Sequence, residues 1–267
     1  MTRKAAAGLA VAGLLTAGGA APAASAPPGY TIARQDGFVA HANGQTRGSV
    51  TCPPGTVPLS GGAAIFTPSL DNNVNSSFPS GSTWIVDVND AGPVDVQFNV
   101  FAVCAAPPRR YAVVETPPTA NPSGLQSGSS ATCPGRSKPV GGGLLSQSGS
   151  TAVNINSTSP AGRSWHVDVG NGSGEDTTFE TFAVCARLRG YVVAVGPPVL
   201  NPPETQTFVN VGCPPATVPV GGGVSSSSAD TLVDLNSTFP NGTAWASFEN
   251  DRTPFPFQVT PYAVCAA

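Results

Sequence analysis

The sequence is poor in charged residues: Asp, Glu, Lys and Arg make up only 10% of its 267 residues, against about a quarter in an average soluble protein. Twelve basic and fifteen acidic residues leave a net charge of −3. Such a chain lacks the overall basic character of proteins that bind nucleic acid or an anionic membrane. We therefore expect neither nucleic acid nor a charged membrane surface as its partner.

After residue 26 the sequence also lacks amphipathic helical patterns and long hydrophobic runs. No segment there repeats its apolar residues with the 3.6-residue period of a helix. The chain contains 31 glycines and 28 prolines instead, between short runs rich in β-branched residues. Turn-forming residues that separate short apolar runs are typical of an all-β extracellular module.

The N-terminal segment has the composition of a secretory signal peptide. Two basic residues precede an apolar run from Ala5 to Ala20, and small residues follow up to Ala26. The alternative is a single membrane anchor, but the run falls short of the ~20 strongly apolar residues that a span needs. We predict a cleaved signal peptide at residues 1–26 and a secreted, extracellular protein with no membrane span after cleavage.

The rest of the chain consists of one block written three times without insertion or deletion. The copies run from Tyr30 to Cys104, from Tyr111 to Cys185 and from Tyr191 to Cys265. In each, the first cysteine follows the tyrosine by 22 residues, a tryptophan comes 32 residues later, and the second cysteine 20 residues after that. Fixed spacing of this kind indicates one small structural unit, repeated. We predict β repeats at residues 27–110, 111–190 and 191–267.

The six cysteines predict disulfides, two cysteines to each repeat. Export to an oxidising compartment makes a disulfide framework the expected chemistry, and the constant separation within a repeat favours pairing inside it. Each such loop closure stabilises its unit by roughly 4 kcal/mol. A zinc site is the rival interpretation, but the chain has no CxxC spacing and only two histidines, so we expect no metal and no cofactor. The predicted pairs are Cys52–Cys104, Cys133–Cys185 and Cys213–Cys265.

Within each repeat the motifs predict five or six short strands. Proline after the first cysteine starts a turn, and the following glycine pairs suggest positive φ, a bulge or the close approach of another backbone. The tryptophan strand and the closing strand that carries the second cysteine should form the core. We expect three tandem disulfide-pinned β-sandwich-like or barrel-like repeats of about 80 residues. The alternative is one β-prism-like body with pseudo-threefold symmetry, in which each repeat contributes a sheet.

The motif CPxGxxPxGGG, the later tryptophan strand and the closing [FY]AVCA resemble repeats in secreted proteins of high-GC Gram-positive bacteria. The Ala-rich N-terminus fits that origin. The resemblance implies export and disulfides, and it transfers no catalytic residue to this sequence.

Catalytic motifs are absent: the chain has no GxSxG or HExxH, and neither histidine recurs in all three copies. We expect a protein that is not an enzyme, although a hydrolase with a site assembled between repeats is a further alternative. What recurs is a polar motif, in which an asparagine opens an Asn-Ser-Ser/Thr sequence in each copy. These residues, predicted as ligand-binding, are Asn75, Asn156 and Asn236.

Two interpretations of those asparagines compete. Amides and hydroxyls on one strand face suit sugar binding, and three weak sites add by avidity. The plainer interpretation is an ordinary polar outer face that leads into a turn. We expect a non-catalytic protein of the cell envelope or extracellular matrix that contacts cell-wall or extracellular polysaccharide. The alternative function is inhibition of an extracellular hydrolase, with the arginines at 109–110 and 187–189 as bait.

Overall fold

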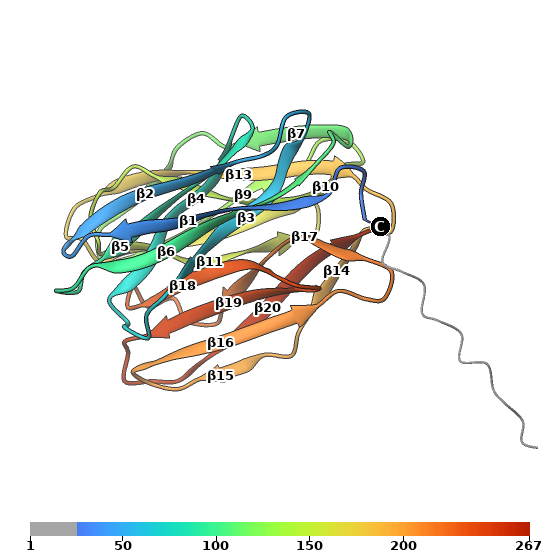
Figure 1. Ribbon diagram of the computed structural model, residues 1–267. Coiled ribbons are helices and arrows are strands. Elements are labelled where there is room, and N and C mark those ends of the chain that lie inside the picture. Colours follow the sequence, from blue (N-terminus) through green and yellow to red (C-terminus); the bar gives the residue numbers. More distant parts are fainter. Residues whose placement is uncertain (1–25) are drawn as a thin grey trace, which may run out of the picture.

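The computed structural model describes residues 26–267, which form twenty β-strands in three sheets and no helix (Figure 1). The predicted all-β fold is confirmed. In this part of the chain no helix is long and apolar enough to cross a membrane. The predicted signal peptide lies, apart from its last residue, outside the described residues.

The three repeats use the same strand order. The first comprises β1 (Thr31–Ala40), β2 (Gly44–Thr51), β3 (Val57–Ile65), β4 (Asn72–Ser80), β5 (Thr83–Asp90) and β6 (Val96–Ala105). The second comprises β7 (Arg109–Glu115), β8 (Thr119–Asn121), β9 (Gln126–Thr132), β10 (Lys138–Ser146), β11 (Val153–Ala161), β12 (Ser164–Asn171) and β13 (Thr177–Arg187). The third comprises β14 (Val192–Val195), β15 (Val199–Asn201), β16 (Thr205–Gly212), β17 (Val218–Ser226), β18 (Val233–Asn241), β19 (Ala244–Asp251) and β20 (Phe257–Ala266).

The long first strand of repeat 1 is divided in two in the other repeats. Between β7 and β8 the chain carries Pro117 and Pro118, and between β14 and β15 it carries Pro197 and Pro198. Proline has no N–H to donate to the ladder, so the strand stops there and resumes beyond the pair. In β1 the chain has no proline, and the strand continues through a bulge beside Gly37.

Every sheet combines strands of two repeats. Sheet A has the order β1-β6-β3-β18-β19-β16, sheet B the order β2-β5-β4-β10-β13-β7, and sheet C the order β14-β20-β17-β11-β12-β9. Strands β8 and β15 add to the ends of sheets B and C by pairing with β13 and β20. The repeats therefore join at three equivalent seams, which are β3 with β18, β4 with β10, and β11 with β17.

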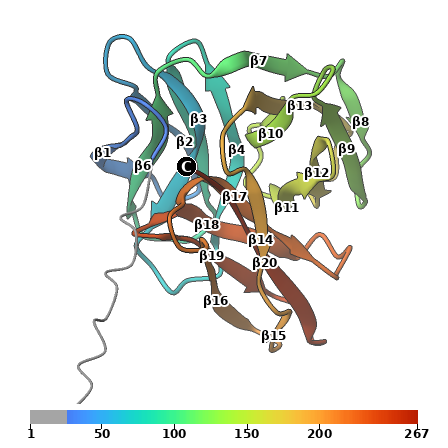
Figure 2. The same cartoon turned by 90° about the vertical axis from the view of Figure 1, so that its right-hand side faces the viewer.

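Each repeat is a sandwich of two small sheets, and each of those sheets continues into a different neighbour. In the first repeat β1-β6-β3 faces β2-β5-β4, and the two layers belong to sheets A and B. Viewed from the end where the C-terminus lies, the three sheets surround a common axis (Figure 2). The sandwich-like repeats and the pseudo-threefold body are thus both present. The structure differs from the prism-like expectation in one detail. Each repeat contributes its two layers to two different sheets, rather than one complete sheet.

The glycine pairs allow the seams to close. A Cβ on Gly62, Gly143 or Gly223 would overlap the main-chain carbonyl oxygen of a residue in the adjoining repeat, namely Thr238, Ser77 or Thr158. The preceding glycine of each pair lies against the tryptophan of its own repeat. Of the sequence-based interpretations of these glycines, close approach of another backbone is the one that the seams display.

The core of each repeat contains the predicted tryptophan and disulfide. The tryptophans are buried, and each indole N–H donates to a hydroxyl seven residues earlier, at 2.7–2.9 Å. Buried indole needs such a partner, so its polar atom is satisfied. The disulfides join the predicted pairs, each with a separation of 52 residues.

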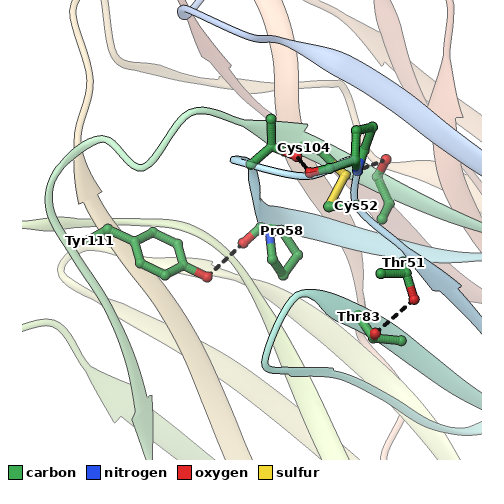
Figure 3. Close-up of a disulfide and its surroundings, with 9 residues drawn as sticks. Thr51, Cys52, Pro58, Thr83, Cys104 and Tyr111 are labelled. Atoms are coloured by element: carbon green, nitrogen blue, oxygen red, sulfur yellow. Dashed lines mark hydrogen bonds between the residues drawn. A yellow bond between two sulfur atoms is a disulfide. The ribbon is translucent and has the colours of Figure 1, made fainter.

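The tyrosine that opens each repeat connects it to another. Tyr111 donates its hydroxyl hydrogen to the carbonyl of Pro58 at 3.0 Å, close to the Cys52–Cys104 disulfide (Figure 3). Tyr191 does the same to Pro139, and Tyr30 to Pro219, so the three bonds run cyclically around the axis. Burial raises the pKa of each of these tyrosines to about 12.

Candidate functional site

The three predicted ligand-binding asparagines lie inside the molecule. Asn75 and Asn156 have 0% of their surface exposed and Asn236 has 1%. Each amide donates to a main-chain carbonyl of another repeat: Asn75 to Val153 O at 2.8 Å, Asn156 to Val233 O at 3.2 Å, and Asn236 to Asn72 O at 2.9 Å. The expectation of an exposed polar patch is therefore corrected, because these amides hold the repeats together.

The physical reason is a β-bulge combined with the shared sheets. The register of β4 against β5 shifts between Val74 and Ser76, so that Asn75 is the extra, unpaired residue. The same shift occurs at Asn156 and Asn236. A bulge redirects a side chain relative to the regular alternation of a strand, and here the adjoining repeat covers the face to which it points. The plainer interpretation, an outer polar face, does not describe these residues either.

A surface hollow of about 480 Å³ lies beyond the ends of β4 and β5 in the first repeat. The loop from β3 to β4 and the loop from β5 to β6 form its walls. Phe66 and Val94, from these two loops, are 57% and 69% exposed. The main-chain N–H of Phe66 is bonded to Gln97 O at 3.0 Å, so its backbone is held while its ring remains available.

The hollow also contains two buried polar side chains that each leave one atom without a hydrogen-bond partner. Asn72 and Asp90 are direct cross-strand neighbours at the ends of β4 and β5, and both line the hollow. Asp90 Oδ1 accepts the N–H of Gly92 at 2.8 Å, whereas its Oδ2 has no partner. The Nδ2 group of Asn72 has none either. A buried donor and acceptor left unpaired are costly, so their place beside a hollow favours a ligand that pairs with both.

Hydrogen bonds fix the rim of this hollow. Asp95 accepts the N–H of Ala42 at 2.9 Å and faces His41 Nδ1 at 3.1 Å. The bond from Ala42, and secondarily that from His41, lower the pKa of Asp95. These contacts tie the loop between β1 and β2 to the loop that carries Val94, so the walls are ordered before any ligand binds.

The second repeat has an equivalent hollow of about 390 Å³ with a different lining. Gln147 replaces Phe66, and Glu175 replaces Val94. Asn171, at the place of Asp90, has its amide bonded to Asn121 O and Glu175 O, both at 2.8 Å. This hollow has a polar lining, and the buried amide of Asn171 behind it is already paired, so the first repeat offers the better binding site of these two.

The third repeat buries three carboxyl groups: Asp251, which occupies the place of Asp90, and the pair Asp234 and Glu249. Asp234 forms an ion pair with Arg252 and accepts from Asn250 at 2.8 Å, while burial raises its pKa to about 7. Glu249 has no partner for either oxygen, and burial raises its pKa well above the usual range. None of the three carboxyls lines the hollows of the first two repeats. Within residues 26–267, no group of three or more His, Cys, Asp or Glu side chains could hold a metal ion.

Sequence reasoning missed the residues of the first hollow. Recurrence in all three copies was the signal for candidate residues, and the residue types at these positions differ from copy to copy: Phe66 corresponds to Gln147 and Ser227, and Asn72 to Val153 and Val233. The sequence signal that could have identified these residues is a departure from the repeat, since Phe66 and Asn72 occupy positions at which the other two copies carry different residue types.

Comparison with known proteins adds no assignment. No protein-family model matches the chain, and no curated protein is significantly similar to it. Function therefore has to be inferred from the geometry of the site.

Proposed function

We propose that this is a secreted, non-catalytic protein of the cell envelope or extracellular matrix that binds polysaccharide through the hollow of its first repeat. The observation that carries the proposal is that the exposed Phe66 ring lines the same hollow as Asp90, whose Oδ2 has no partner, and Asn72, whose Nδ2 has none. A sugar presents an apolar C–H face and a set of hydroxyls, and it can meet these groups together. Specific sites combine apolar lining with a few placed polar groups in this way.

Each group has a role in this proposal. The ring of Phe66 stacks on the sugar face, and Val94 extends the apolar contact. The Oδ2 atom of Asp90 accepts a hydroxyl hydrogen, and Asn72 Nδ2 donates to a second hydroxyl. Export and the oxidised cysteines are compatible with one another, because disulfides persist in an extracellular compartment.

The test is retention of the purified, non-reduced protein on cell walls and insoluble polysaccharides, with competition by soluble sugars. We expect saturable retention that falls by about tenfold in Phe66→Ala and in Asp90→Asn, since one stacking contact or one charged hydrogen bond is worth roughly that factor. Asp90→Asn keeps an oxygen for Gly92 N–H. The matched control is Gln147→Ala in the second hollow, which should bind as the wild type does. Flow-through of the wild type on every matrix, or retention unchanged in both variants, contradicts the proposal.

Inhibition of an extracellular hydrolase is the second candidate, since the arginines of the joints between repeats are exposed. Arg109 and Arg187, however, lie on β7 and β13 and face each other in the ladder. A protease cleft takes an extended segment whose main chain is free, and these segments are already paired. Inhibition of a trypsin-like enzyme by the intact protein would favour the inhibitor function over polysaccharide binding.

A further inference from the structure

The joints between the repeats form a further surface hollow, which lies beside the C-terminal Ala267. Figure 2 views the molecule from the end at which the C-terminus lies. The volume of the hollow is about 290 Å³. Three arginines from two different joints line it, together with prolines, alanines and Leu188. The arginines are Arg109, Arg187 and Arg189.

These arginines have no anionic partner. None of the salt bridges among residues 26–267 involves them, and no Asp or Glu side chain lines the hollow. Ala267, the last residue of the sequence, also lines the hollow, but its terminal carboxylate forms no salt bridge with these arginines. All three are exposed. Because the chain has only twelve basic residues and a net charge of −3, their convergence is not a consequence of overall composition.

The placement of Arg109 and Arg187 also opposes stability. They are direct partners in the antiparallel ladder of β7 and β13, and like charges directly opposite each other destabilise a sheet. The corresponding pair in the first repeat is Pro28 with Ala106, joined by a main-chain bond of 2.9 Å. The fold thus forms the same joint without arginine, so the charges are not needed for the connection.

We propose that this hollow binds phosphate groups. Guanidinium groups recognise phosphate through paired, charge-assisted hydrogen bonds. A tetrahedral anion can accept from three guanidinium groups that approach from different directions, whereas a planar carboxylate is satisfied by one or two. The ligand class is therefore a phosphate ester or a free phosphate, and the site is separate from the hollow that carries Phe66.

The test measures binding of two probes to the intact protein at about 20 mM salt: inorganic phosphate and a short linear polyphosphate. The site variant combines Arg109→Gln, Arg187→Gln and Arg189→Gln. The matched control combines Arg34→Gln, Arg136→Gln and Arg163→Gln, which remove the same charge from other exposed places. We expect the site variant to lose at least about tenfold in polyphosphate affinity and the control less than about threefold, with a weaker salt dependence in the site variant.

The two probes distinguish the source of the phosphate. Equal affinity for both identifies a small free anion as the ligand, and preference for polyphosphate identifies a phosphate-bearing polymer. Equal loss in the two triple variants, or no saturable binding by the wild type, overturns the proposal. Tighter binding of polygalacturonate or of a single-stranded oligonucleotide than of polyphosphate also overturns it, because the site would then select carboxylates or nucleic acid.

The site variant should melt at or above the temperature of the wild type, because it removes the opposition of Arg109 and Arg187. If the site variant melts at a lower temperature than the wild type, the single variant Arg189→Gln replaces it in the binding test, because that variant leaves the Arg109–Arg187 pair intact. A loss of polyphosphate affinity is again expected. Polysaccharide binding through Phe66 should be unchanged in all these variants, so failure of this proposal is distinguishable from failure of the proposed function.

Discussion

Glu249 is fully buried in the third repeat, at a position where the other repeats carry Val88 and Val169. Neither of its carboxyl oxygens has a hydrogen-bond partner. Burial, and secondarily the charge of Asp234, raise the pKa of Glu249 well above that of a free glutamate. A buried carboxyl in this environment keeps its proton at pH values at which a free glutamate has ionised.

This burial makes stability dependent on pH. In the unfolded chain a glutamate ionises at about pH 4.3, whereas folded Glu249 keeps its proton at higher pH. Between those two pKa values the native state binds more protons than the unfolded state, so the free energy of unfolding falls as pH rises. The slope is about 1.4 kcal/mol per pH unit for one group, and the stability is fully present only below the unfolded pKa.

We expect Glu249→Val to raise the free energy of unfolding, with a gain that grows above about pH 5 by up to roughly 1.4 kcal/mol per unit. Denaturant unfolding at several pH values measures it. Glu249→Gln separates ionisation from polarity, because it should show the same reduced pH slope while it keeps a polar group in the core. A difference from wild type that does not vary with pH would contradict the assignment.

At the residue scale, the sequence predicted the disulfides and the buried tryptophans of the core. Cysteine spacing identified the disulfide pairs, and the tryptophans are buried as expected, because both depend on contacts within one repeat. The prediction that Asn75 lies on an outer strand face was wrong, and the two-residue alternation of a strand could not have revealed this. A bulge turns the residue, and the surface that covers it belongs to the second repeat.

At the scale of elements, the seams between repeats depend on strands that carry glycine. Strands β4 and β10 meet through a single pair, Ser77 with Leu144. The serine beside each buried asparagine reinforces its seam, as Ser76 does by accepting the N–H of Ser146 at 3.0 Å. A side chain at Gly143 would separate these backbones, because its Cβ would overlap Ser77 O.

We expect Gly143→Ala to destabilise the protein by about 3 kcal/mol or more, since main chain cannot move aside as a flexible side chain can. The matched control is Gly149→Ala, a few residues along the same segment, where an added Cβ meets no atom within 4 Å. That control should change the free energy of unfolding by less than about 0.5 kcal/mol. Equal stabilities of the two variants would show that the seam tolerates a wider separation.

At the scale of the whole molecule, the sequence predicted three units but left open whether they are independent. Short joints suited either arrangement, and the motifs of one repeat contain no information on which strand edge pairs with which neighbour. The answer lies in pairings between residues far apart in the chain, such as Ala63 with Thr238. Both proposed binding hollows likewise depend on residues that differ between the repeats, and recurrence of a residue type in all three copies does not identify such residues.

Because each sheet takes strands from two repeats, no repeat can keep both of its layers paired without its neighbours. An isolated repeat 27–110 would expose the edges of β3 and β4, and Asn75 would lose its acceptor, Val153 O. We therefore expect the three repeats to unfold in one transition, with a slope against denaturant that corresponds to the surface of the whole chain.

The tryptophans make this measurable, since each repeat contains one. Three variants, each keeping a single tryptophan and carrying Phe at the other two positions, report separately on Trp84, Trp165 and Trp245. Within one variant the tryptophan fluorescence and the far-ultraviolet circular dichroism should give the same midpoint, because the reporter repeat and the whole set of sheets unfold together. A fluorescence midpoint displaced from that of the circular dichroism would show that a repeat can unfold alone, and that the shared sheets couple the repeats less strongly than their pairing indicates.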